Sequence, residues 1–99
     1  MTGNIAIPRE KVSAFCRRHH IRRLSLFGSV LRDDFTPESD VDVLVEFEPG
    51  HTPGWEIVSM ADELTEILGR GVDLHTPASL SRYFRDEVLA EAEEQYVAT

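Results

Sequence analysis

Hydrophobic and polar residues alternate along residues 41–48, which are written VDVLVEFE. A period of two is typical of a β-strand, because successive side chains point to opposite faces of a sheet. Shorter apolar stretches predict two more strands, at residues 22–27 and 72–75. Gly28 follows the first of these strands and Gly71 precedes the last, which places a turn signal beside each.

Apolar residues at helical spacing fill the segments around these strands. In the last helix, Leu80, Phe84 and Val88 are expected to pack on the sheet. The order of elements predicts one domain, residues 1–99, of the α/β (α+β) class, with a small mixed β-sheet covered by helices. The expected helices span about residues 8–20, 55–68 and 76–96, with a short helical turn at residues 28–32.

The chain carries a net charge of −8, but its charges are unevenly distributed. Residues 1–32 contain seven Lys or Arg and one acid, whereas residues 33–99 contain three Lys or Arg and seventeen acids. Nonspecific nucleic-acid binding requires the neutralisation of many phosphates, so we expect no direct nucleic-acid binding from an acidic chain. The basic first third suits a single polyphosphate or an acidic partner, or else it is a solvated helix face.

The single cysteine, Cys16, lies on the apolar face of the first expected helix, which favours a buried thiol over a reactive one. One cysteine forms no internal disulfide, and this suits the cytoplasm. The first residues, MTGNIAIPREK, lack the apolar segment of a signal peptide, and no apolar run reaches the length of a membrane span. We therefore expect a cytoplasmic protein without membrane contact.

Two aspartates, Asp40 and Asp42, stand at alternate positions where the central strand begins. Asp is among the poorest strand formers, and like charges two residues apart point to the same face of a sheet. There they repel each other and lose solvation, and a divalent cation offsets both costs. The alternative is that both charges protect an edge strand from aggregation.

Two further features support a metal site. Gly28-Ser29 lies where a strand gives way to a helical turn, and such a turn offers free N–H groups to an anion. Asp73 projects from the third strand between two apolar residues, and His75 shares its face. If the two strands are neighbours, three carboxylates meet on one surface, as two-metal phosphoryl transfer requires.

Gly28-Ser29, ten intervening residues and the run Asp40-Val41-Asp42 reproduce a motif of the DNA-polymerase-β-like nucleotidyltransferases, which this chain resembles. Within that superfamily it is similar to the MNT group, the minimal nucleotidyltransferases that usually act as antitoxins of helical HEPN toxins. The segments LSLFGSVLR, SDVDVLVEF and VDLHTPASL carry the likeness, which extends over about residues 5–97.

The resemblance implies a role for each matching residue. Two magnesium ions, or manganese in their place, would be held by carboxylates, and ATP would be the substrate. Asp73 would either complete the metal site or take the proton of the acceptor hydroxyl. The implied catalytic and metal-binding residues are Asp40, Asp42 and Asp73, and the implied nucleotide-binding residues are Gly28, Ser29 and Arg32.

Structural interpretations of the same residues remain open. Asp73 also suits a solvent-facing strand position, Ser29 a helix N-cap, and Arg32 a salt bridge. Trp55 is expected as a core anchor, with stacking on a nucleotide base as the alternative.

Two other positions call for separate interpretations. His19 and His20 are expected on a helix surface, because adjacent helical side chains diverge and no third metal ligand is evident. Asp33 stands where the family often has glycine, and Asp tolerates the left-handed conformation that such a turn uses.

The chain has a catalytic core and little beyond it, so the remaining binding surface is expected from a second polypeptide. We expect an antitoxin-type, Mg-dependent nucleotidyltransferase that forms a hetero-complex with a HEPN ribonuclease toxin. It would transfer AMP from ATP to a hydroxyl of the toxin, with tyrosine as the expected acceptor, and so neutralise it. The alternatives are a non-catalytic antitoxin that neutralises the toxin by direct binding and a small-molecule nucleotidyltransferase.

Overall fold

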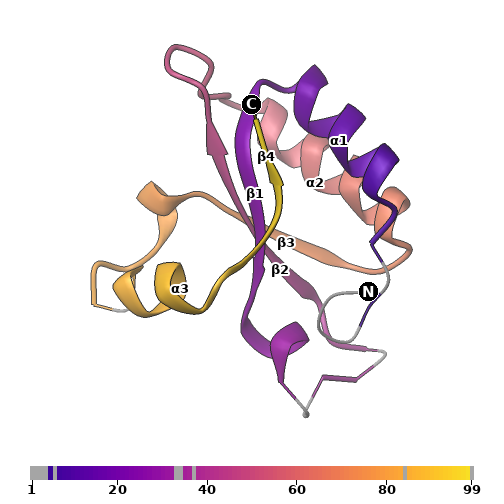
Figure 1. Cartoon of the computed structure of the whole chain (residues 1–99), viewed down its shortest axis with the longest axis vertical. Coiled ribbons are helices and arrows are strands. Elements are labelled where there is room, and N and C mark those ends of the chain that lie inside the picture. The colour runs from indigo at the N-terminus through magenta and orange to yellow at the C-terminus, as the bar shows by residue number, and fades with distance from the viewer. Residues whose placement is uncertain (1–4, 6, 33–34, 37, 84, 99) are drawn as a thin grey trace.

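A computed structural model describes residue 5 and residues 7–32, 35–36, 38–83 and 85–98 (Figure 1). Asp33 and Phe84, for which the sequence made specific predictions, lie outside the described residues. The elements are α1 (Arg9–Arg18), β1 (Ile21–Phe27), the 3-10 turn η1 (Gly28–Leu31), β2 (Val41–Phe47), α2 (Glu56–Leu68), β3 (Val72–His75), the 3-10 turn η2 (Pro77–Ser79), α3 (Arg85–Glu91) and β4 (Glu93–Val97).

The strands form one sheet in the order β3-β2-β1-β4. β1 pairs antiparallel with both β2 and β4, whereas β2 and β3 are parallel. A parallel pair needs a crossover connection, and α2 supplies it. The result is a mixed sheet with helices packed on it, which confirms the α+β class expected from the sequence.

The two faces of the sheet have different partners. Val41, Val43 and Val45 of β2 are fully buried beneath α1 and α2, where they pack with Phe15 and Leu64. The alternate face carries a smaller cluster beneath η2 and α3, made of Phe27, Leu44, Leu80 and Val88. In Figure 1, α1 and α2 accordingly lie on one side of the sheet and α3 on the other. The period of two along β2 thus separates a large core from a half-open surface.

The expected last helix is wrong at both ends. Thr76 does cap a turn, since its Oγ1 accepts a hydrogen bond from the Ser79 N–H at 3.2 Å, but that turn is only η2. Residues 93–97 form β4 instead of continuing the helix to Tyr96. The open edge of β1 offers these residues a hydrogen-bonding partner, and Tyr96 packs against the main core from there. Tertiary pairing therefore overrides the helical preference of the segment AEAEEQ.

The first helix follows its prediction closely. Val12, Phe15 and Cys16 are buried on one face of α1. Burial raises the pKa of the Cys16 thiol to about 12, so the expected unreactive thiol is confirmed. Within the described part of the chain, no helix combines the length and the apolar character needed to cross a bilayer.

Trp55 departs from its prediction. It immediately precedes α2, and 92% of its surface is exposed, so it does not anchor the core. The buried residues of α2 lie further along the helix, at Met60 and Leu64, and these two side chains pack into the main core.

Candidate active site

The parallel pairing of β2 and β3 brings two of the predicted carboxylates together. Asp42 lies directly opposite Asp73, and Val41 lies opposite Val72. Because both strands alternate in phase, the two aspartates share one face and the two valines share the other. The face with the aspartates is the one that α1 and α2 leave uncovered.

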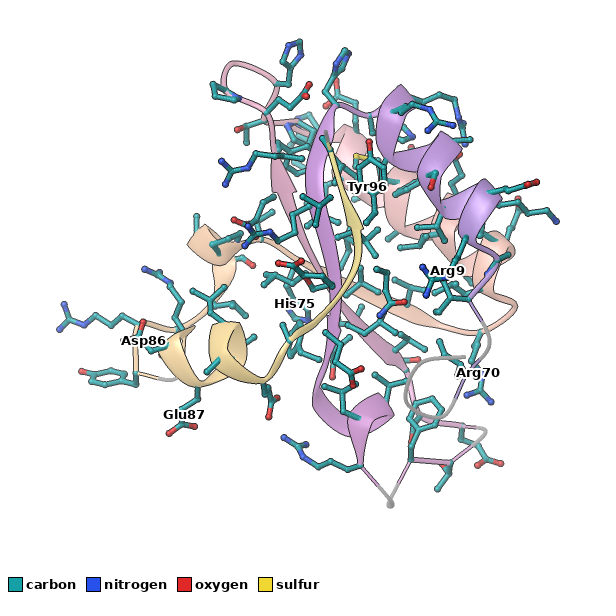
Figure 2. The ribbon with its side chains drawn as sticks, in the orientation of Figure 1. Arg9, Arg70, His75, Asp86, Glu87 and Tyr96 are labelled. Atoms are coloured by element: carbon teal, nitrogen blue, oxygen red, sulfur yellow. The ribbon has the colours of Figure 1, made fainter. Side chains whose placement is uncertain are left out.

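His75 is the third member of this cluster. It lies on the side of the sheet that carries α3 (Figure 2), two residues beyond Asp73 on the same strand. Its Nε2 atom lies 3.3 Å from Asp73 Oδ2 and 3.5 Å from Asp42 Oδ1. One ligand atom from each of the three residues lies within 4.8 Å of the others, which is the spacing of a candidate metal site. The expectation that His75 shares this surface is met in the structure.

Asp40 occupies a neighbouring position. It precedes β2 by one residue and lies outside the group of ligand atoms formed by Asp42, Asp73 and His75. Its carboxylate contacts the backbone of Gly71, and a Cβ atom at position 71 would collide with Asp40 Oδ1. Gly71 therefore makes room for the first aspartate of the motif, a role that the sequence analysis did not assign to it.

Gly28 makes room for the second aspartate of the motif, Asp42, in the same way. Its φ angle is +78°, which L side chains rarely adopt, and a Cβ atom there would collide with Asp42 Oδ2. Phe27, the residue before it, lies opposite Asp42 in the β1–β2 ladder. The glycine of the motif thus permits both the turn into η1 and the close approach of a carboxylate.

The electrostatic state of Asp42 reflects this crowding. Burial raises the pKa of the Asp42 carboxyl above its ordinary value of 3.8, and the charges of Asp73 and Asp40 raise it further. His75 opposes the rise. A bound cation favours the ionised form of every carboxylate around it, so it would reverse the cost that these neighbours impose.

The residues expected to contact phosphate gather at the end of β1. Ser29 lies inside η1, and its carbonyl accepts a hydrogen bond from the Arg32 N–H at 2.9 Å. The Glu91 carboxylate, at the end of α3, accepts a hydrogen bond from the Gly28 N–H at 3.3 Å and lies 3.5 Å from the Arg32 guanidinium. The two donors expected to meet phosphate therefore already face an anion.

Three of the structural interpretations can now be judged. The edge-strand interpretation fails for Asp42, because β2 is paired on both sides. The N-cap interpretation fails for Ser29, because Phe27 occupies the cap position of η1. The salt bridge expected of Arg32 is present, with Glu91, and it does not exclude a phosphate contact.

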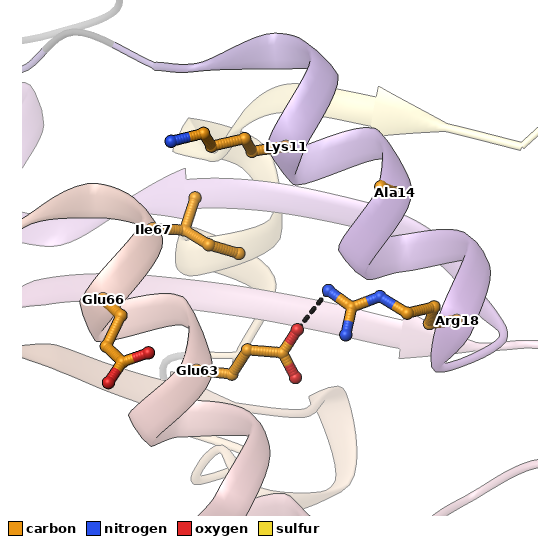
Figure 3. Close-up of a pocket in the computed structure, with 6 residues that line it drawn as sticks. All are labelled: Lys11, Ala14, Arg18, Glu63, Glu66 and Ile67. Atoms are coloured by element: carbon orange, nitrogen blue, oxygen red, sulfur yellow. Dashed lines mark ion pairs between the residues drawn. The ribbon is translucent and has the colours of Figure 1, made fainter.

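A separate groove of about 360 Å³ lies between α1 and α2 (Figure 3). Its lining includes Lys11, Ile67 and an ion pair between Arg18 and Glu63. These helices cover the face of the sheet opposite Asp42, so the groove is remote from the carboxylates. It does not belong to the candidate active site.

The fold and the paired carboxylates together define a nucleotidyltransferase. The chain matches the nucleotidyltransferase domain family over residues 9–97 and belongs to this family. It is similar to the Methanocaldococcus jannaschii protein named "Putative protein adenylyltransferase MJ0435". The two are 36% identical over 89 residues, which cover 90% of this chain and 95% of the relative.

The solved structures that share the fold include a minimal nucleotidyltransferase and a toxin–antitoxin complex. The "Structure of putative minimal nucleotidyltransferase" is 38% identical to this chain, covers 85% of each chain and has a TM-score of 0.70. A tri-AMPylated Shewanella oneidensis HEPN toxin in complex with its MNT antitoxin is 21% identical, with a TM-score of 0.65. That match covers 91% of this chain and 70% of the other, and it shows that the two chains share a fold.

Two residues of the site have no signal in the sequence. Gly71 was expected only as the approach to β3, because nothing local indicates that Asp40 lies against it. Glu91 lies 63 residues from Gly28 and was expected within a longer helix. Both contacts depend on how distant segments pack, and periodicity does not report that packing.

Proposed function

We propose that this chain is a magnesium-dependent protein adenylyltransferase that transfers AMP from ATP to a tyrosine hydroxyl of a partner HEPN ribonuclease toxin, and so neutralises it. The observation that carries the proposal is the pairing of Asp42 with Asp73 beside the Gly28-Ser29 turn. The name of the M. jannaschii relative supports protein adenylylation, and the AMPylated toxin in the S. oneidensis complex supports the partner.

The residues present fit a hard divalent cation. Asp42 and Asp73 offer carboxylate oxygens within 4.8 Å of each other. Burial raises the pKa of the Asp42 carboxyl, and the charges of Asp73 and Asp40 add to the rise, so a cation bound there would offset both costs. The His75 Nε2 atom is buried and lies 3.3 Å from Asp73 Oδ2 and 3.5 Å from Asp42 Oδ1, so it adds a third possible ligand beside the two carboxylates. Mg²⁺ commonly takes one or two carboxylates together with substrate phosphates, and Mn²⁺ accepts the same ligands.

The proposed ligands are Asp40, Asp42 and Asp73. They would hold two metal ions, which either arrive bound to ATP or are already in place when ATP binds. Bound there, the ions would neutralise charge that develops on the attacking and leaving oxygens. Asp40 lies outside the compact group, so its carboxylate suits an ion shared with the substrate phosphates.

In the proposed reaction the tyrosine hydroxyl attacks the α-phosphorus of ATP. A bond forms between the tyrosine oxygen and phosphorus, and the bond from phosphorus to the oxygen bridging to the β-phosphate breaks. Pyrophosphate leaves with that oxygen, and Asp73 accepts the proton of the hydroxyl. The side chain of Asp73 is 60% exposed, so an acceptor from another chain can reach it.

The remaining motif residues bind the nucleotide in this proposal. Ser29 and the Gly28 N–H hold the phosphates, and Arg32 supplies a positive charge beside them. For this to happen, the phosphate must replace the Glu91 carboxylate at the Gly28 N–H. The nucleotide site is therefore partly occupied by the protein's own anion before ATP binds.

Incubation of the toxin with this protein, ATP and Mg²⁺ tests the proposal. After separation under denaturing conditions and refolding, the toxin should carry the mass of AMP on tyrosine and should lack ribonuclease activity. Asp42→Asn and Asp40→Asn should abolish both effects. Asp62→Asn is the matched control, because Asp62 is exposed on α2 and remote from the site.

A different result would identify a binding antitoxin. An occluder inhibits by mass action, so its effect disappears on separation. An unmodified toxin that regains activity, with Asp42→Asn neutralising it as well as the wild type does, would overturn the enzymatic proposal. Modification of small hydroxyl compounds with no effect on the toxin would indicate a small-molecule nucleotidyltransferase. The single domain of residues 1–99 and the cytoplasmic location stay predictions.

A further inference from the structure

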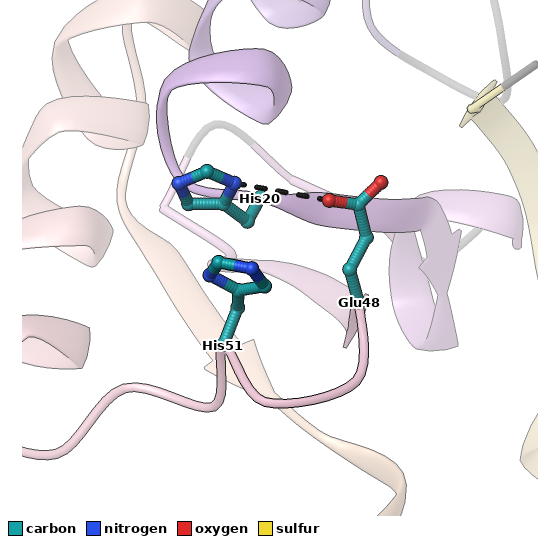
Figure 4. A group of neighbouring side chains, drawn as sticks. All are labelled: His20, Glu48 and His51. Atoms are coloured by element: carbon teal, nitrogen blue, oxygen red, sulfur yellow. Dashed lines mark ion pairs between the residues drawn. The ribbon is translucent and has the colours of Figure 1, made fainter.

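A second group of metal-ligating side chains lies at the far end of the β1–β2 pair (Figure 4). It consists of His20, Glu48 and His51, and one ligand atom from each lies within 4.8 Å of the others. His20 precedes β1 and Glu48 follows β2, so the antiparallel pairing brings these residues together. Nothing in the proposed nucleotidyl transfer uses them.

The backbone holds this group in place. The Glu48 N–H donates a hydrogen bond to the His20 carbonyl at 2.9 Å, and the His51 N–H donates to the Glu48 carbonyl at 3.0 Å. His20 has a φ angle of +56°, which is uncommon for a residue other than glycine, and Gly50 turns the chain with a φ angle of +82°. The turns at these two residues precede β1 and follow β2, and they carry the side chains that face each other.

The side chains themselves are close and accessible. The imidazole rings of His20 and His51 stack with their centroids 3.9 Å apart and their planes 18° from parallel. The His20 Nδ1 atom lies 3.7 Å from Glu48 Oε2, and about half of each of these two side chains is exposed. His20 and His51 are both exposed residues, so an ion from solvent can reach this group.

We propose that His20, Glu48 and His51 form a binding site for a divalent transition-metal ion of the zinc class. Two imidazole nitrogens and one carboxylate oxygen are a donor set that Zn²⁺ accepts, with a fourth tetrahedral position left for water. Imidazole donors favour Zn²⁺, Ni²⁺ and Cu²⁺ over Mg²⁺, which prefers oxygen. The site therefore selects a different metal from the one proposed at Asp42 and Asp73.

The ion requires a small rearrangement of the rings. The lone pairs of stacked imidazole rings lie in two nearly parallel planes, whereas two ligands of one ion must direct their lone pairs to a common point. Rotation about the side-chain torsions of the exposed His20 and His51 achieves this without moving the backbone. The site is also separate from the carboxylates, because Glu48 follows Asp42 by six residues of extended chain, about 20 Å.

Neighbouring His19 offers a matched control. It is adjacent in sequence, but its Nε2 atom lies 3.0 Å from Glu63 Oε1 and contacts α2 instead. The sequence suggested no third ligand beside His19 and His20; among the described residues this holds for His19, which joins no group of three ligating side chains, and is wrong for His20. His19 contacts Glu63, and His20 meets Glu48 and His51.

Calorimetric titration of the tag-free full chain with Zn²⁺, in excess Mg²⁺, tests the proposal. The wild type should bind one equivalent of Zn²⁺ at this site, and His20→Gln or His51→Gln should weaken that binding at least about tenfold. His19→Gln and the double variant Asp42→Asn/Asp73→Asn should retain it. Saturating Zn²⁺ should also raise the Tm of the wild type but not that of His51→Gln.

Co²⁺ gives a second readout, because its visible absorption reports its coordination. The spectrum of a four-coordinate Co²⁺ complex should appear with wild type and His19→Gln and be absent with His51→Gln. Zn²⁺ binding that is lost in Asp42→Asn/Asp73→Asn, or that is equal in His51→Gln and His19→Gln, would overturn the proposal. A wild type that binds no Zn²⁺ would also overturn it. The metal-free Tm of each variant is compared with that of the wild type, so that a loss of binding is not a loss of folding.

Discussion

The two ends of strand β2 carry two groups of metal-ligating side chains with opposite chemistry. At the start of the strand, Asp42, Asp73 and His75 supply two carboxylates and one imidazole. Beyond its end, Glu48 joins His20 and His51 to supply one carboxylate and two imidazoles. The first set suits a hard ion that arrives with phosphates, and the second suits a borderline ion held by the protein alone.

The two groups also differ in how the fold builds them. Asp42 and Asp73 stand on paired strands, so the register of the sheet fixes their separation. His20 and His51 stand on turns, and their positions depend on two residues with positive φ angles. A group on regular strands tolerates changes in nearby loops, whereas a group on turns is sensitive to each turn residue.

The largest expected effect is that a variant in each group loses the function of that group and keeps the function of the other. Asp73→Asn should reduce AMP transfer by at least about 10³-fold, because it removes both a metal ligand and the proposed proton acceptor, and it should leave Zn²⁺ binding intact. His51→Gln should do the reverse, with transfer rates within about twofold of the wild type. Rates are measured by mass spectrometry of the toxin. Loss of transfer in both variants would mean that the two groups are one functional unit.

A glycine beside the first group should have the next largest effect. Gly71→Ala places a Cβ atom against the Asp40 carboxylate, which must move. A displacement of about 1 Å at a catalytic group costs on the order of 10²-fold in rate, so AMP transfer should fall by about that factor. Gly54→Ala is the control, because its added Cβ would meet Glu56 Oε2 at an ordinary 3.7 Å. Full activity of Gly71→Ala would remove Asp40 from the reaction.

Glu91 should affect nucleotide affinity more modestly. Glu91→Gln removes the negative charge that faces the Gly28 N–H and Arg32, so a triphosphate no longer competes with it. Exposed ion pairs are worth about 0.2–1 kcal/mol, which predicts an ATP–Mg²⁺ affinity about 1.4- to fivefold tighter by calorimetry. Glu87→Gln, on the same helix and exposed, should bind as the wild type does. Weaker binding by Glu91→Gln would instead assign Glu91 a supporting role.

The smallest effect concerns stability and pH. Because the pKa of Asp42 is raised in the folded chain, the folded state binds more protons than the unfolded state between pH 3.8 and the folded pKa. The free energy of unfolding of the wild type should therefore fall, relative to Asp42→Asn, as pH rises through this window. Without metal, Asp42→Asn should have a higher Tm at neutral pH than the wild type. Mg²⁺ with ATP should reduce this difference in Tm, because the ions stabilise the wild type. Equal curves for both proteins would show that burial and the neighbouring charges do not raise the pKa of Asp42 in the folded chain.

The sequence predicted the parts of the site that depend on local pattern. Alternation placed Asp42 and Asp73 on one face of their strands, and Gly28 marked the turn where β1 ends. Period and turn chemistry act over a few residues, so a single sequence reports them well. The prediction that the carboxylates meet was made on the condition that the two strands are neighbours. β2 and β3 do pair, so this condition is met.

The parts that depend on distant packing were not predicted. β4 has a local sequence suited to a helix, and its partner β1 lies about seventy residues away along the chain, as in the pair Leu26–Glu93. The group of His20, Glu48 and His51 forms because β1 begins where β2 ends. Trp55 was expected in the core from its size alone, yet its position before α2 leaves it exposed.

The register between β2 and β3 has a consequence for how this kind of protein varies. The separation of Asp42 and Asp73 in space is set by ladder hydrogen bonds and not by the number of residues that connect them. Insertions or deletions in the crossover through α2 can therefore lengthen or shorten the chain between these aspartates without disturbing the chemistry, as long as the strands keep their phase. A slip of one residue in either strand, by contrast, would turn one carboxylate into the valine core. The number of residues between Asp42 and Asp73 can therefore change, but both aspartates must stay on the same face of the sheet.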